Sequence, residues 1–362
     1  MQQSIPESLK ISPFMAAFVV VSMQIGIGVL GFQRIISKDA GYDAWMSVIG
    51  AGLAVHIIVW MMYKICEGVD GDVMAANIFV FGKTIGNSIN TLFIIYFTMT
   101  CLTLLSGLIE VIRTWMFLSM HPIFFASVYL LLGIYIVNGG FRTVVGISLF
   151  GIVVPAYLLF SFLAPIRYGD FTNLLPIFDH TPVQMLKGAY NMTLTYLGYG
   201  VLLFIYPFIK KPKESKKWVH IGLTATMIFY TLLAVITFAY FPISLLQKSI
   251  WATLEMWKIV KLPFIERFEY LGLANWALII LPNVAISLWV ASRVAKRVYH
   301  ISQRKAVLFI AAVVLICVLM LDSRERINIF HDLQAKAGFI LAFIYTPFLY
   351  ILLLIKKKVN AK

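Results

Sequence analysis

The chain has 362 residues, of which 61% are hydrophobic and only 13% are charged, and its mean hydropathy is +0.89. Soluble domains carry about 25% charged residues, so this composition excludes a soluble enzyme and indicates an integral membrane protein. The formal net charge of +14 would suit a nucleic-acid partner if the basic residues formed a domain of their own.

Ten segments are apolar enough to cross a membrane, which takes about 20 mainly apolar residues each. They are residues 12–36, 45–66, 85–116, 122–137, 144–165, 183–209, 219–241, 271–298, 306–321 and 338–355. We therefore expect an all-α integral membrane fold of ten transmembrane helices. Little sequence remains for a second domain, so residues 1–362 are predicted to form a single polytopic membrane domain.

The basic residues concentrate on one set of connections between these segments. The main groups are Lys210, Lys211, Lys213, Lys216 and Lys217; Arg293, Lys296, Arg297, Arg304 and Lys305; and the tail Lys356–Lys358. Because Lys and Arg favour cytoplasmic loops, both termini are predicted to be cytoplasmic. The positive charge then reflects the membrane topology. Membrane lipid is the expected partner of the basic loops, and no nucleic-acid partner is expected.

One long connection, residues 242–270, carries Leu246, Trp251, Leu254 and Trp257 among Lys and Glu residues. This pattern is typical of an amphipathic helix that lies on a membrane surface. We expect such a helix at the outer interface.

Patterns of catalytic or metal-binding residues are missing from the sequence. The three cysteines form no CxxC pair, and the six histidines lack metal-ligand spacing. We therefore expect no enzyme activity, no cofactor and no metal site. His56 lies deep within the second segment, where it either packs and hydrogen-bonds or relays protons.

Glycines interrupt the first and sixth segments. Gly26, Gly28 and Gly31 fall in the first, and Gly198 and Gly200 fall in the sixth. Glycine-broken helices at matching positions of two halves indicate a transporter-type binding site, in which half-helix N-termini attract a carboxylate and freed carbonyls attract a cation. Helix-packing glycines are the alternative interpretation.

Polar residues on the third and eighth segments could complete such a pocket. Tyr96, Thr100 and Glu110 share one helical face of the third segment, and Arg113 is spaced to pair with Glu110. Asn283 and Ser287 lie one turn apart on the eighth. Each set is either cavity-lining or structural.

The order of these motifs resembles the B subunits of bacterial spore germinant receptors, in the spore-permease branch of the amino acid–polyamine–organocation superfamily. The resemblance rests on Gly26-Ile-Gly-Val-Leu-Gly-Phe-Gln-Arg34, on Tyr196-Leu-Gly-Tyr-Gly-Val-Leu-Leu-Phe-Ile-Tyr-Pro207, and on Phe264-Ile-Glu-Arg-Phe-Glu269. It implies two inverted five-helix repeats, about residues 12–165 and 183–355, with helices 1 and 6 broken.

The resemblance also implies a small-molecule site at the two breaks. The matching residues are Gly26, Ile27 and Gly28; Leu197 and Gly198; Tyr96 and Thr100; and Asn283 and Ser287. The implied ligand is a germinant such as an amino acid, the implied partners are A and C subunits, and the implied location is the inner membrane of a spore. Gln33 and Gly200 stand where many members have proline and an acid, respectively.

Three functions fit these expectations. The first is a germinant-sensing receptor subunit that uses a transporter fold. The second is a proton- or ion-coupled transporter of amino acids or related solutes, with His56 or Glu110 in the ion pathway. The third is a scaffold within a receptor.

Overall fold

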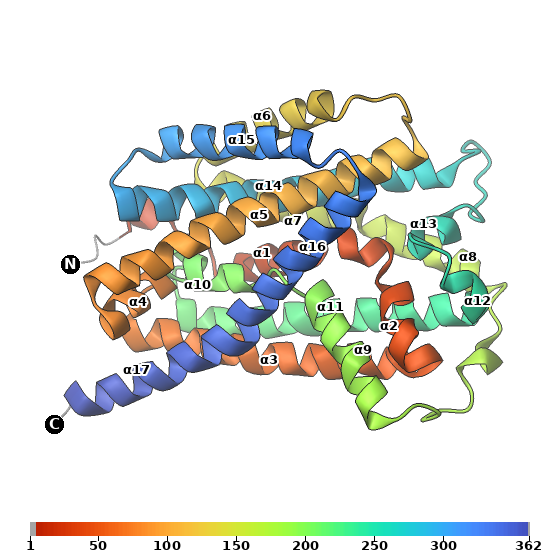
Figure 1. The fold of residues 1–362 in the computed structure, drawn as a ribbon, viewed down its shortest axis with the longest axis horizontal. Helices are drawn as coiled ribbons and strands as arrows, with labels where there is room; N and C mark the ends of the chain where they lie inside the picture. Colours follow the sequence, from red (N-terminus) through yellow and green to blue (C-terminus); the bar gives the residue numbers. More distant parts are fainter. Residues whose placement is uncertain (1–4, 361–362) are drawn as a thin grey trace.

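A computed structural model describes residues 5–360 of the chain (Figure 1). These residues form helices and no sheet. Their only strand-like pairings are two isolated bridges, Ile11 with Ile209 and Leu262 with Ile265. The predicted all-helical class is therefore confirmed for the described part of the chain.

The helices follow one another with short connections. Their bounds are η1 (Glu7–Leu9), α1 (Met15–Gln24), η2 (Ile27–Leu30), α2 (Phe32–Ala40), η3 (Gly41–Asp43), α3 (Ala44–Val69), α4 (Val73–Phe81), α5 (Lys83–Trp115), α6 (Pro122–Asn138), α7 (Phe141–Val153), η4 (Val154–Phe162), α8 (Leu163–Ile166), η5 (Phe171–Leu174), α9 (Pro182–Thr195), η6 (Tyr199–Val201), α10 (Leu202–Ile205), η7 (Tyr206–Phe208), α11 (Pro212–Tyr240), α12 (Ile243–Leu246), α13 (Ala252–Trp257), α14 (Phe268–Tyr299), α15 (Gln303–Met320), α16 (Arg324–Phe339), η8 (Ile340–Tyr345) and α17 (Thr346–Asn360).

Seven helical stretches among these are long and apolar enough to cross a membrane. They are Phe32–Val69, Lys83–Trp115, Phe141–Ile166, Pro212–Tyr240, Phe268–Tyr299, Gln303–Met320 and Arg324–Asn360. Three shorter apolar helices, Met15–Gln24, Pro122–Asn138 and Tyr199–Phe208, cover parts of the other predicted segments. The multi-pass character is confirmed, and the count of ten transmembrane helices remains a prediction.

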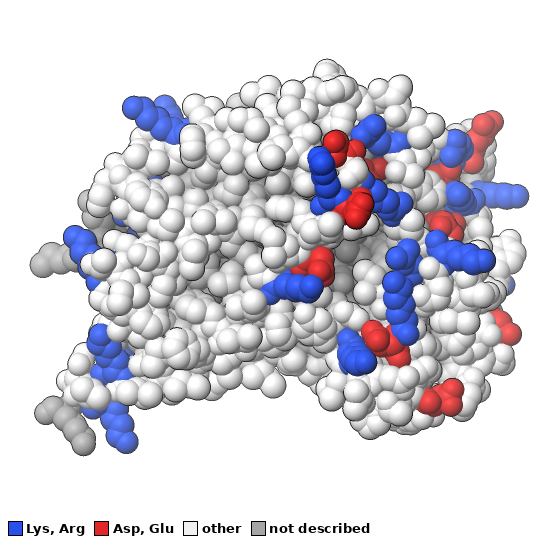
Figure 2. Space-filling model, viewed as in Figure 1, with Lys and Arg blue, Asp and Glu red and all other residues white. Residues whose placement is uncertain are grey.

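The long helices run roughly along one axis, and α16 and α17 cross them obliquely (Figure 1). The first and last described residues lie at the same end of this bundle. Figure 2 shows Lys and Arg at that end of the visible face and both signs of charge at the opposite end. The middle of the face is mainly uncharged, as expected for a surface that contacts lipid.

The last helix begins earlier than the sequence predicts. We expected the final span at residues 338–355, but the helical chain runs from Arg324 through Asn360, with a π-helical turn at η8. The predicted span lies within this stretch, but its start differs because α16 carries charged, exposed side chains that lower its average hydropathy, among them Arg324, Asp332 and Lys336. Two other polar residues of α16, His331 and Gln334, face the cavity described below.

The connection at residues 242–270 also differs from expectation. It forms two short helices, α12 and α13, rather than one helix on the membrane surface. The side chain of Trp257 is fully buried, and its indole Nε1 donates a hydrogen bond to Ser161 Oγ at 2.8 Å. The apolar face of this segment therefore packs on protein instead of lipid.

Candidate ligand-binding site

The first interruption lies between α1, which ends at Gln24, and η2, which begins at Ile27. Gly26 adopts an extended backbone there, with φ −112° and ψ −159°. Glycine disfavours a helix by about 1 kcal/mol relative to alanine, so the two glycines at 26 and 28 favour an interruption at this point of the span. Backbone groups near the middle of the span are thereby released from the helical pattern.

The second interruption lies between α9, which ends at Thr195, and η6, which begins at Tyr199. Gly198 has a φ of +123°, a conformation that L side chains rarely adopt. A Cβ on Gly198 would lie 2.2 Å from the carbonyl oxygen of Met23, and a Cβ on Gly28 would lie 3.1 Å from Thr195 Cγ2. The two interruptions therefore contact each other.

A cavity of about 470 Å³ opens beside this contact. Its walls come from both interruptions and from α5, α16 and η8. The aromatic part of the wall includes Phe93, Tyr96, Phe97, Tyr199, Phe204 and Tyr345. Such a volume, with apolar walls and a few polar groups, is typical of small-molecule sites.

Seven of the sequence-predicted ligand residues line this cavity. They are Gly26, Ile27, Gly28, Tyr96, Thr100, Leu197 and Gly198. The structure thus brings the two interruptions and the polar face of α5 together around one space. Whether these residues contact a ligand remains a prediction.

The two residues predicted on α14 do not line this cavity. Asn283 and Ser287 are fully buried. Asn283 Oδ1 accepts a hydrogen bond from Ser22 Oγ at 2.6 Å, and its Nδ2 donates to the carbonyl oxygen of Ile25 at 3.1 Å. Ser287 Oγ donates to the Asn283 carbonyl oxygen within the same helix. Asn283 therefore holds the C-terminal end of α1 through hydrogen bonds outside the cavity.

Helix α16 contributes residues to the cavity that the sequence did not predict. His331, Gln334 and Gly338 line it and share one helical face, with spacings of three and four residues. Gln334 Nε2 donates to Thr100 Oγ1 at 2.8 Å, and His331 Nε2 lies 3.0 Å from Ser106 Oγ. The helical spacing of these residues is a visible signal in the sequence, but they lie between the predicted apolar segments 306–321 and 338–355.

The π-helical turn η8 was also missed. Leu341, Ala342 and Tyr345 from this turn line the cavity together with Thr346. Thr346 Oγ1 donates to the carbonyl oxygen of Leu341 at 2.9 Å. Single π-turns often occur at functional sites, and hydropathy alone does not indicate them.

Glu110, one of the two residues predicted for an ion pathway, lies outside the main cavity. It lines a second, smaller cavity of about 250 Å³ near the C-terminal end of α5 and the N-terminal end of α16. Its Oε1 lies 3.4 Å from Arg324 Nε, whereas the pairing with Arg113 predicted from spacing is not formed. Because α16 passes alongside α5, Glu110 pairs with Arg324, which is distant in the sequence, instead of with the nearby Arg113.

His56, the other predicted pathway residue, lines neither cavity. Its Nδ1 lies 2.7 Å from Nδ1 of His220 on α11, and the two rings are stacked. Both side chains are half-buried. The contact between His56 and His220 joins α3 to α11. A role of His56 in proton transfer stays a prediction.

Comparison with known proteins identifies the family. The model of the family described as "Spore germination protein" matches residues 10–327. The chain belongs to the spore germination protein family. This finding confirms the family predicted from the interrupted segments and the accompanying motifs.

Relatives in the family match nearly the whole chain. Spore germination protein GerQB of Bacillus cereus is 40% identical over 358 residues, which cover 99% of both chains. Spore germination protein A2 of Bacillus subtilis (strain 168) is 22% identical over 364 residues and covers 98% of both chains.

Solved transporter structures share the fold at low sequence identity. The structure of MhsT in complex with L-phenylalanine superposes with a TM-score of 0.61 and 13% identity, covering 94% of this chain and 87% of that one. A manganese transporter of Eremococcus coleocola gives a TM-score of 0.64 and 14% identity, covering 96% and 81%. The germination protein thus has a transporter fold.

Proposed function

We propose that this chain is the germinant-sensing membrane subunit of a spore germinant receptor. In this proposal the cavity between the two interruptions binds a small molecule, an amino acid or a similar nutrient. The observation that carries the proposal is the cavity itself, which joins both interrupted spans in a member of the spore germination protein family.

The proposed ligand residues are those of the interruptions and of α5. Gly26, Ile27 and Gly28 would form one side, Leu197 and Gly198 the other, and Tyr96 and Thr100 the wall between them. Asn283 and Ser287 would act as positioning residues, because their hydrogen bonds hold α1 and α14.

Signalling would follow from a shift between two arrangements of the interrupted spans. A ligand that binds one arrangement more tightly raises its population. Partner A and C subunits would then respond to that arrangement. The proposal involves no enzymatic step and no cofactor.

The proposed topology has ten transmembrane helices in one polytopic domain, residues 1–362, of which residues 1–4 and 361–362 lie outside the described part. Two inverted repeats would cover residues 12–165 and 183–355. Both termini would be cytoplasmic in the inner membrane of the spore. The basic end of the molecule in Figure 2 supports this orientation.

A working secondary transporter is the second candidate, favoured by the fold shared with solved transporters. It would carry amino acids or related solutes, with His56 or Glu110 in a proton or ion pathway. Both residues lie outside the main cavity, so coupling would act at a distance from the solute.

One experiment separates the two candidates. Spores that lack this chain are complemented with it, and germination is measured against a panel of nutrients. The effective nutrient is then offered in labelled form to proteoliposomes that contain the purified chain. A receptor restores germination, co-purifies with A and C subunits and accumulates no label, whereas label accumulation without a germination response would establish the transporter.

A further inference from the structure

The smaller cavity, of about 250 Å³, is distinct from the proposed germinant site. Its residues come from the C-terminal end of α5, the start of α6, the end of α15 and the start of α16. Ser106 lines this cavity, and its Oγ lies 3.0 Å from Nε2 of His331, which lines the main cavity. The two cavities are therefore neighbours that meet at one polar contact.

Four charged side chains line the smaller cavity, namely Glu110, Arg113, Asp322 and Arg324. Arg324 Nε lies 3.4 Å from Glu110 Oε1, and Asp322 Oδ1 accepts a hydrogen bond from Arg326 Nη1 at 3.0 Å. Arg113 forms no ion pair within the described part of the chain. Both acids are thus engaged, and the positive charge of Arg113 is left without a counter-ion.

The surroundings of Arg113 make this charge costly. The side chain is half-buried, and its Nε is buried with no hydrogen-bond partner among residues 5–360. Buried charges are normally paired and hydrogen-bonded. An anion in the cavity would supply the missing counter-charge, and phosphate oxygens suit the planar fork of N–H groups that arginine presents.

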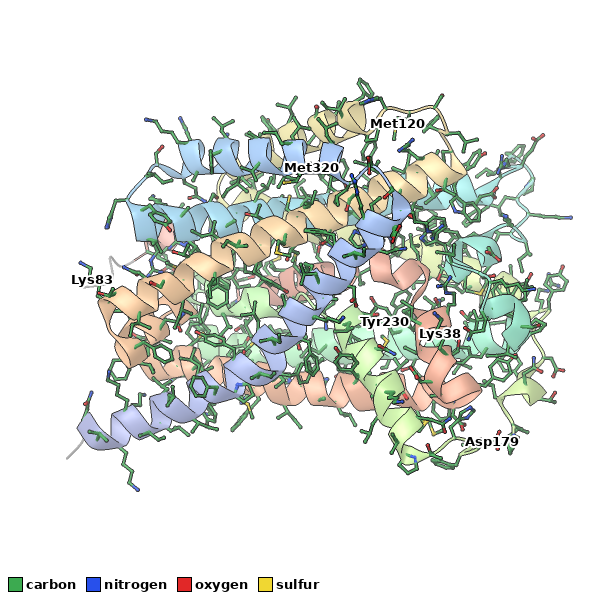
Figure 3. All side chains as sticks on the ribbon, viewed as in Figure 1. Lys38, Lys83, Met120, Asp179, Tyr230 and Met320 are labelled. Carbon is green, nitrogen blue, oxygen red and sulfur yellow. The ribbon has the colours of Figure 1, made fainter. Side chains whose placement is uncertain are left out.

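Exposed apolar side chains border the cavity. Leu118, which lines it, is 81% exposed, and Met320 at the end of α15 is 65% exposed. Phe117 and Phe124, on either side of the α5–α6 connection, are also largely exposed. Figure 3 labels Met120 and Met320 in this region. Because α15 is apolar enough to span a membrane, this apolar surface is suited to contact with lipid chains.

Two tryptophans indicate that the cavity lies near the membrane surface rather than at its centre. Trp115 is the last residue of α5, and Lys258 Nζ lies 4.5 Å from the centre of its ring. The guanidinium carbon of Arg324 lies 5.2 Å from the ring centre of Trp251. Tryptophan and long basic side chains mark the level of the lipid headgroups, and Figure 2 shows charged side chains of both signs at this end of the molecule.

We propose that the smaller cavity binds the phosphate headgroup of an anionic phospholipid, with Arg113 as its counter-ion and the acyl chains along α6 and α15. The unpaired positive charge selects an anion, and the apolar border selects a molecule with hydrocarbon chains. A free phosphate ion would use the arginine but not the border. The lipid would bind whether or not the main cavity holds a germinant.

Two pairs of variants test this site. Arg113→Gln removes the proposed counter-ion and keeps a polar side chain. Its control is Lys258→Gln, which removes one positive charge at the same end of the molecule from an exposed residue that does not line the cavity. Leu118→Glu places a carboxylate at the border without touching Arg113, and Leu118→Gln is its matched control. The high exposure of Leu118 makes both changes compatible with folding.

The measurement is the melting temperature of the full-length chain in a non-ionic detergent, titrated with dioctanoyl phosphatidylglycerol, dioctanoyl phosphatidylcholine or inorganic phosphate. A ligand that binds only the folded protein raises this temperature. We expect the largest rise with phosphatidylglycerol, a smaller one with phosphatidylcholine and none with inorganic phosphate at the same concentrations.

The variants should separate by charge at the cavity. Arg113→Gln should raise the phosphatidylglycerol concentration that gives half of the rise by about tenfold, as expected for the loss of one charge-assisted hydrogen bond. Lys258→Gln should match the parent chain. Leu118→Glu should require more phosphatidylglycerol than Leu118→Gln, because its carboxylate repels the headgroup.

Three results would overturn the proposal. The first is an equal rise with both lipids that Arg113→Gln leaves unchanged, since the lipids would then act as detergent does. The second is a rise with inorganic phosphate and none with lipid, which would identify a site for a free anion. The third is no rise with any probe. If Arg113→Gln does not fold, equal phosphatidylglycerol responses of Leu118→Glu and Leu118→Gln would overturn the proposal in its place.

Discussion

Gly198 lies directly against the carbonyl oxygen of Met23, so closely that a Cβ on Gly198 would be 2.2 Å from that oxygen. This contact joins the two interrupted spans, which are separated by about half of the sequence. Because a carbonyl oxygen of the backbone cannot swing aside as a flexible side chain can, the site depends on glycine at this position.

A Gly198→Ala substitution should therefore destabilise the protein. Its φ of +123° and ψ of −29° form a backbone conformation that L residues rarely adopt, at a cost of about 1–3 kcal/mol, and the collision with Met23 adds to this. We expect a clearly lower melting temperature in detergent. Gly200→Ala is the control, because a Cβ there meets nothing within 4 Å; equal melting temperatures for the two variants would contradict the contact.

Asn283 is expected to matter for stability more than Ser287. Replacing Asn283 with alanine leaves Ser22 Oγ and the Ile25 carbonyl without their partner, at a cost of about 1–3 kcal/mol for each buried polar group. Ser287→Ala removes a bond within its own helix and should have a smaller effect.

Thermal unfolding of the Ser22→Ala, Asn283→Ala and double variants tests this link. Contacting residues give non-additive effects, so the double variant should lose less stability than the two single losses combined. Strict additivity would show that the Ser22–Asn283 bond does not hold the interruption.

Buried and exposed ion pairs at the basic end of the molecule should behave differently. Asp72 is almost fully buried, pairs with Arg297 and accepts the Ala75 backbone N–H at the start of α4. Asp72→Ala leaves Arg297 without its partner, and breaking buried pairs costs about 3–5 kcal/mol. We expect strongly reduced yield and melting temperature.

Glu7, which pairs with Lys210 on the surface, offers the matched comparison. Exposed ion pairs contribute little, so Glu7→Gln should melt close to the parent chain and be less sensitive to salt. A loss as large as that of Asp72→Ala would contradict the assignment of Asp72 as the structural acid.

The sequence predicted most of what forms the two interruptions, because glycines and apolar segments are local signals. It did not predict the α16 wall, since His331 and Gln334 lie on a polar helical face that lowers average hydropathy. It left Asn283 as either a cavity-lining or a structural residue, because one helical face can point toward a cavity or toward a neighbouring helix, and Asn283 is not among the residues that line the cavity. The hydrogen bond from Tyr230 Oη to the carbonyl oxygen of Gln24 joins residues 206 positions apart, and no local pattern reveals it.

The structure also changes which variant best probes the site. A large side chain at Gly198 would be a simple way to block the cavity, but the contact with Met23 makes such a change a test of folding. Gly26 is better suited. Its backbone is extended, and a Cβ there would make an ordinary contact with Leu104 Cδ2 at 3.7 Å.

The most direct test of the central claim is the germination dose response of spores that carry Gly26→Trp, compared with Gly26→Ala at matched protein level. Tryptophan should fill the cavity between the interruptions and abolish the response, while alanine should leave it near that of the parent. A normal dose response from a stably inserted Gly26→Trp chain would contradict the cavity as the site of germinant sensing.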